Sequence, residues 1–139
     1  MTLMNDIRAA LETRLVATTG IPTVVLPNQR YERDPNVPFV RAQFTPTARR
    51  PDVRGPNPMQ RIDGLYLLTI CQPEYLGEGP GLIVADKLLT RFDATLDIAY
   101  GAFKVGINYA ELGPNFPDTP FFCTPVVVSW FTYHQGEQS

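Results

Sequence analysis

The amino-acid sequence predicts an α+β fold, a two-layer sandwich in which two helices cover one mostly antiparallel or mixed sheet of about five strands. Two observations lead to this class. Apolar residues recur at helical spacing in two stretches, and they alternate with polar residues in several others, in the order α-β-β-β-α-β-β without a repeat. With 139 residues, 44% of them hydrophobic and 19% charged, the chain is expected to form a single domain over 1–139.

The first third of the chain predicts a helix followed by two strands. Leucine and isoleucine recur every four residues over 2–19, with charged residues between them, and Gly20 and Pro22 end the pattern. A short β-branched strand follows over 23–26. After a charged turn, the alternation of apolar and polar side chains over 39–44 predicts a half-buried strand.

The rest of the chain predicts three strands and a second helix. The strand pattern over 60–71 is polar at its start and apolar on both faces later, which is typical of a strand that enters the centre of a sheet. Beyond a turn rich in proline and glycine, the apolar residues over 82–92 have helical spacing. The alternating stretches over 103–109 and 121–133 predict an antiparallel pair.

One face of the predicted sheet is unusually apolar. Leu65 and Leu67 share this face with Phe121, Phe131 and other apolar residues of the last strand. Soluble monomers rarely expose apolar patches of this kind. We therefore expect an oligomer contact to cover this face.

A long loop is predicted at about 45–61, with the sequence TPTARRPDVRGPNPMQR. The loop and its flanks hold five arginines and one aspartate, a net charge of +4 in a chain whose total is −2. These arginines are Arg41, Arg49, Arg50, Arg54 and Arg61. Connections of this length in a compact domain are usually functional or disordered, and disorder in the isolated subunit stays open. In an assembly, an ordered role at a contact is favoured, because arginine is enriched in interfaces.

The expected partner of this basic loop is protein rather than nucleic acid. Ten of the twelve cationic residues are arginine, which favours planar, bidentate contacts, and the net negative charge of the chain does not suit nonspecific nucleic-acid binding. The chain beyond Arg61 holds three cations and nine acids, so it could itself supply an acidic surface for the loop.

Several classes of function are not supported by the sequence. His134, the single histidine, follows the last strand and has no evident nucleophile partner. The glycines over 77–81 lack the lysine and hydroxyl of a phosphate loop. Cys71 and Cys123 lack metal-site spacing, which favours reduced, buried thiols. The sequence predicts no catalytic residue, cofactor or metal site, and no apolar run approaches the roughly 20 residues that span a bilayer.

Several strings along the chain, in their order and spacing, resemble a known family. These strings are IRAALETRL (7–15), PFVRAQFTP (38–46), RIDGLYLLTI (61–70), the turn at 73–81, VADKLLTRF (84–92) and PVVVSWFTY (125–133). Over nearly its whole length the chain resembles the small tail-terminator, or tail-completion, proteins of long-tailed bacteriophages, including a group described as a phage-related domain of unknown function. Its loop ELGPNFPDTPFF is longer and richer in proline than the pattern of that family.

The resemblance implies a structural virion protein of the tail or neck, assembled in the host cytoplasm, and not an enzyme. Such proteins form a ring, usually a hexamer, that caps the tail tube, stops tail polymerisation and gives the surface for head–tail joining. The implied partners are further copies of the chain, the tail tube protein and a head-completion or stopper protein. DNA would pass through the lumen without sequence-specific binding, and no membrane would be involved.

We expect the protein interface to use arginines of the loop and apolar residues of the exposed sheet face. The candidate residues are Arg49, Arg50, Arg54, Arg61, Leu65, Leu67, Phe121 and Phe131. Two alternatives stay open. Another head–tail connector or tail-tube component would share the ring contacts, and a small α+β enzyme would require a deep pocket with converging polar groups.

Overall fold

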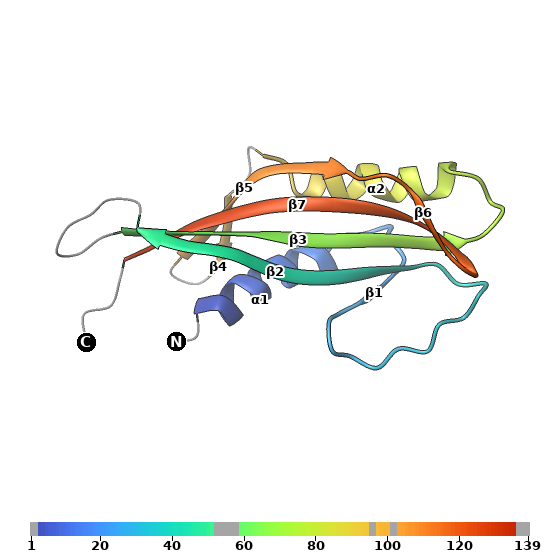
Figure 1. The fold of residues 1–139 in the computed structure, drawn as a ribbon, viewed down its shortest axis with the longest axis horizontal. Helices are drawn as coiled ribbons and strands as arrows, with labels where there is room; N and C mark the ends of the chain where they lie inside the picture. Colours follow the sequence, from blue (N-terminus) through green and yellow to red (C-terminus); the bar gives the residue numbers. More distant parts are fainter. Residues whose placement is uncertain (1–2, 52–58, 95–96, 101–102, 136–139) are drawn as a thin grey trace.

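The computed structural model describes residues 3–51, 59–94, 97–100 and 103–135 (Figure 1). The α+β class is confirmed, with two helices and seven strands in these residues, in the order α-β-β-β-α-β-β-β-β. They are α1 (Leu3–Val16), β1 (Thr23–Val25), β2 (Phe39–Pro51), β3 (Met59–Pro73), α2 (Gly79–Arg91), β4 (Asp97–Tyr100), β5 (Phe103–Leu112), β6 (Phe116–Asp118) and β7 (Phe121–Gln135). Neither helix is long and apolar enough to cross a membrane.

One curled, mixed sheet contains all of these strands, in the order β1-β2-β3-β7-β5-β4, with β6 paired to β7. Short β1 runs parallel to β2, and the other described pairs are antiparallel. The centre of the sheet is the pair β3–β7, in register from Met59 opposite Gln135 to Pro73 opposite Phe121. The predicted pairing of 103–109 with the last strand is also confirmed.

Both helices pack on the same face of the sheet, the inner face, where they form one apolar core. Alternate residues of β3 from Ile62 to Ile70 are buried on this face, as are alternate residues of β7 from Val126 to Trp130. The core also contains Ile7, Leu11 and Leu15 of α1, Leu88 of α2 and the adjacent Phe92. The four-residue spacing that predicted the first helix therefore marks the residues that enter the core.

Within this core, Trp130 of β7 packs closely against β3 and β2. The Trp130 indole stacks on the Phe44 ring with 5.3 Å between centroids and 6° between planes. It also lies over Gly64, the residue directly opposite on β3, where a Cβ atom would come within 2.2 Å of the indole ring. Because Gly64 has no side chain, there is room at this position for the indole ring of Trp130, the largest residue of the core.

The prediction of a long loop at 45–61 is wrong over most of that range. β2 continues to Pro51 and β3 begins at Met59, so the two strands pair along the polar segment and form a ribbon, and only 52–58 lie outside the described residues. On its other side β3 pairs with β7 as far as Met59. A bulge between Pro46 and Ala48 shifts the register. The backbone hydrogen bonds between the strands can stabilise a ribbon whose side chains are mostly polar. Pro46 is tolerated because β1 pairs only with 39–41 of β2, so no neighbouring strand lies on that side of Pro46.

Smaller differences concern the ends of elements and two short strands. The first helix ends at Val16 and the second begins at Gly79, with Pro80 in its first turn, a position where proline needs no hydrogen-bond partner. β4 and β6, which the sequence did not predict, hold four and three residues.

The two cysteines are free and buried, as predicted, and lie directly opposite each other on β3 and β7. The Sγ atoms of Cys71 and Cys123 are 2.8 Å apart. Burial raises the pKa of both thiols, so both are protonated at neutral pH.

Replacing Gly64 with alanine should destabilise the fold. The added methyl group would overlap the Trp130 ring, and we expect a loss of about 1–3 kcal/mol in the free energy of unfolding, measured by denaturant titration. Gly79→Ala is the matched control, since a Cβ there has nothing within 4 Å. Equal stability of the two variants would contradict this account of the Trp130 packing.

Candidate functional site

The outer face is the face of the sheet opposite the helices, and no helix of the described residues covers it. On its central strands it presents alternate residues of β3 and β7. These are Arg61, Asp63, Leu65, Leu67 and Thr69 of β3, and Pro125, Val127, Ser129, Phe131 and Tyr133 of β7. Of this set only Ser129 is buried and Tyr133 is 43% exposed, whereas the others are half-buried.

One end of the outer face is covered by the chain itself. The segment 26–38, between β1 and β2, brings Tyr31 against a small buried cluster that contains Phe39 and Phe121. The Arg33 guanidinium lies 4.8 Å from the Phe121 ring centroid and pairs with Asp118 at 3.4 Å. Phe121 is fully buried and is not available to a partner, contrary to the prediction from the sequence.

At the opposite end of this face, Arg61 organises a group of side chains from three strands, the Arg61 cluster. Its guanidinium donates hydrogen bonds to Asp63 Oδ1 at 2.9 Å, to the Tyr133 hydroxyl at 3.0 Å and to Asn108 Oδ1 at 3.3 Å. It also lies over the Phe131 ring, 4.6 Å from the centroid. The hydrogen bonds to Asp63 and Tyr133 raise the pKa of Arg61, so its charge is permanent at any physiological pH.

The backbone below the Arg61 cluster fits its side chains. Phe131 lies over Gly106 of β5, where a Cβ atom would come within 2.5 Å of the ring. A bulge between Ile107 and Tyr109 interrupts the register of β5, and the Asn108 amide there donates to Ser129 Oγ at 3.2 Å. Contacts with β5 and β7 therefore restrain Phe131 and Asn108 of the cluster in the single chain, without a partner.

The structure places most of the predicted interface residues near one another. Arg61, Leu65, Leu67 and Phe131 share the open part of the outer face. Arg49 and Arg50 lie on β2, opposite Ile62 and Arg61, in the ribbon that continues from this face. Arg54 lies outside the described residues. Asn108 and Asp63 were not predicted as site residues.

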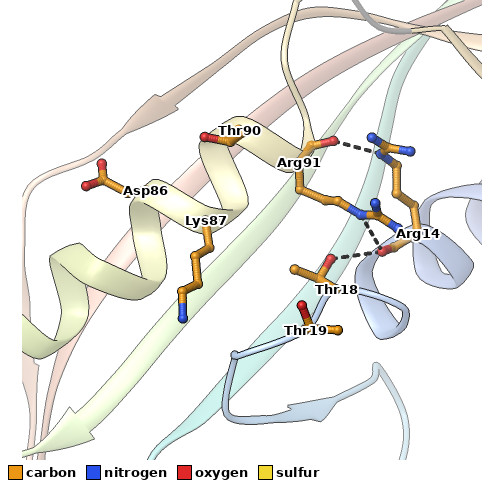
Figure 2. Close-up of a pocket in the computed structure, with 7 residues that line it drawn as sticks. All are labelled: Arg14, Thr18, Thr19, Asp86, Lys87, Thr90 and Arg91. Carbon is orange, nitrogen blue, oxygen red and sulfur yellow. Dashed lines mark hydrogen bonds between the residues drawn. The ribbon is translucent and has the colours of Figure 1, made fainter.

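A hollow of about 500 Å³ lies between α1 and α2 and is lined by Arg14, Thr18, Thr19, Asp86, Lys87, Thr90 and Arg91 (Figure 2). Its lining holds one carboxylate and neither histidine nor cysteine. Among the described residues, no group of three or more histidine, cysteine, aspartate or glutamate residues could hold a metal ion.

Replacing Arg61 with alanine should lower the free energy of unfolding by about 1 kcal/mol, because hydrogen bonds and a cation–π contact are lost at a partly exposed position. Arg61→Lys should recover only part of this, since an ammonium group cannot reproduce the planar fork. Chemical denaturation measures both variants. Arg30→Ala, at an exposed arginine in the segment 26–38, is the control. A loss no larger than that of the control would contradict the role assigned to Arg61.

Comparison with known proteins gives a family and a similar fold. A family model described as "Phage tail terminator protein" matches residues 6–130. One solved structure covers 99% of this chain and 99% of its own, with a TM-score of 0.73 and 20% sequence identity, which supports the fold alone. No curated protein matches the chain. The match over most of its length shows that the chain belongs to the phage tail terminator protein family, a family of structural bacteriophage tail proteins whose function implies contact with the tail tube.

Proposed function

We propose that this protein closes the bacteriophage tail as a ring of identical subunits, a hexamer by resemblance to its family. The ring caps the tail tube, stops tail polymerisation and gives the surface that joins the head. The observation that carries this proposal is the outer face, where a preformed polar and apolar surface lies beside a basic ribbon with no helix of the described residues over it.

The open part of the outer face has the composition of a protein interface. Leu65, Leu67 and Val127 are half-buried apolar residues beside the Arg61 cluster, which supplies arginine and aromatic side chains. Arginine and aromatic residues are enriched in interfaces. Because contacts beneath the cluster already restrain it, binding would immobilise few additional side chains and would cost little conformational entropy.

The basic ribbon suits a ring whose subunits contact one another head to tail. Arg49, Arg50 and Arg54 lie in the part of the chain with excess positive charge, whereas the residues beyond Arg61 carry excess negative charge. In a heterologous ring, each subunit offers one patch to a different patch of its neighbour. In the alternative arrangement, the same arginines contact the tail tube protein or a head-completion or stopper protein.

The mechanism requires no covalent chemistry. One face of the ring would match the last ring of the tail tube, and the other face would not accept a further tube subunit. DNA would pass through the lumen without sequence-specific contacts. The protein would assemble in the host cytoplasm and remain in the tail or neck of the virion.

Replacing Arg49, Arg50 and Arg54 together with alanine should leave the fold intact and impair assembly, because the substitutions remove charge from the ribbon without touching the described core. Circular dichroism and thermal unfolding test the fold. Electron microscopy of tails made with the variant should show abnormal lengths and a loss of joined heads. Arg30→Ala is a control for the loss of an exposed arginine. Tails of normal length with heads attached would contradict this role of the arginines.

The purified wild-type protein gives a second test of the same function. Negative-stain images, alone and with tail tubes, should show single closed rings and rings at tube ends. Stacking of the protein into tubes would identify a tube component instead. A monomer under conditions that permit assembly, measured by size-exclusion chromatography with light scattering, would contradict ring formation.

A further inference from the structure

The hollow between α1 and α2, the basic hollow, gathers three cations on the helix side of the molecule. Arg14 Nε donates to the carbonyl oxygen of Arg91 at 2.7 Å, and Arg91 Nε donates to the carbonyl oxygen of Arg14 at 3.3 Å (Figure 2). Lys87 Nζ donates to the carbonyl oxygen of Gly20 at 3.0 Å. The last turn of each helix thus receives a hydrogen bond from an arginine of the other helix. Both of these bonds use Nε, so the terminal guanidinium nitrogens can bind a ligand.

Among the described residues, the two arginines of the basic hollow form no ion pair with a carboxylate. The single carboxylate of the lining, Asp86, points away from the two arginines in Figure 2. Burial and the nearby charge of Arg91 lower the pKa of Arg14, so an anion placed here would relieve an existing repulsion.

A smaller apolar pocket adjoins the basic hollow and shares both arginines with it. It holds about 210 Å³, and its lining includes Ala10, Ala17 and Ile98 beside Arg14 and Arg91. Two guanidinium groups next to an apolar recess suit a segment that carries carboxylates beside an aromatic or aliphatic side chain. A phosphate backbone would use the charges but would leave the apolar recess unfilled.

The same chain presents such a segment at the other end of α2. In the acidic turn, Glu74 to Glu78, the side chain of Tyr75 is 97% exposed and that of Leu76 is 57% exposed. Tyr75 also has a φ of +70°, a conformation that is costly for a bulky residue. Strained backbone conformations cluster at functional sites, so the exposed Tyr75 is a candidate for contact with a partner.

We propose that the acidic turn of one copy docks in the basic hollow of the next copy, with its glutamates on the arginines and lysine and Tyr75 in the apolar recess. This inference rests on the proposed ring and identifies one contact between its subunits. Because the turn precedes α2 and the hollow contains the last turn of α2, the contact is head to tail, as a closed ring requires.

A cysteine pair tests the contact directly. Leu76→Cys in one preparation and Thr19→Cys in another should give cross-linked dimers with a short bismaleimide when mixed, and neither should do so alone. The native cysteines are buried and are poor targets for the reagent. The control replaces Thr19→Cys with Gln29→Cys, at an exposed residue that does not line the hollow. No cross-link above that control would overturn the proposal.

A charge exchange gives an independent readout. Lys87→Glu, and separately Glu74→Lys with Glu78→Lys, should each raise the concentration needed for half-maximal association at least tenfold, as measured by light scattering. Together in one chain they should restore much of the lost association. Circular dichroism verifies that each variant is folded. Association unchanged by both sets of substitutions would overturn the proposal.

The outcomes separate this contact from the function as a whole. Closed rings in electron micrographs without the cross-link would reject the contact and leave the terminator ring standing. The cross-link without closed rings or capped tails would support the contact and reject the proposed function. Protection of Thr19→Cys by a short DNA duplex, lost in Arg91→Gln, would assign the hollow to phosphate and overturn docking by a second copy.

Discussion

The structure depends on the antiparallel pairing of β3 with β7, which runs through fifteen residue pairs at the centre of the sheet. Two glycines make this pairing compatible with large side chains on both faces. Gly64 makes room for Trp130 on the inner face, and Gly106 of the neighbouring β5 makes room for Phe131 on the outer face. The same strand, β7, therefore supplies the largest side chain of the core and an aromatic residue of the outer face.

The order and type of the longer elements could be predicted because their side chains are buried periodically. The helical spacing of Ile7, Leu11 and Leu15 survives in the structure because these residues enter the core. The ribbon at 45–51 could not be predicted in this way, because it gains its stability from ladder hydrogen bonds with β3 and shows no apolar face. The short strands β4 and β6 likewise depend on edges supplied by β5 and β7.

The candidate site was predictable only in part, for similar reasons. Arg61, Leu65, Leu67 and Phe131 could be assigned to one face because strand periodicity fixes the direction of side chains. Phe121 has the same periodicity, but the segment 26–38 folds over it, and no local pattern predicts that tertiary contact. Asn108 joins the Arg61 cluster at a bulge in β5, and a bulge is set by strand pairing rather than by the sequence around it.

The ribbon that replaces the predicted loop has a mechanical consequence. At its far end β3 is paired with β2 on one side and with β7 on the other, so Arg49 and Arg50 stand on a three-stranded support. Such a support bends far less than a single tethered strand would. The positions of these two residues are thereby tied to the orientation of the whole sheet. A partner protein that bound these two residues would therefore be held at a fixed angle to the sheet. The ribbon would set the orientation of the partner in addition to attracting it.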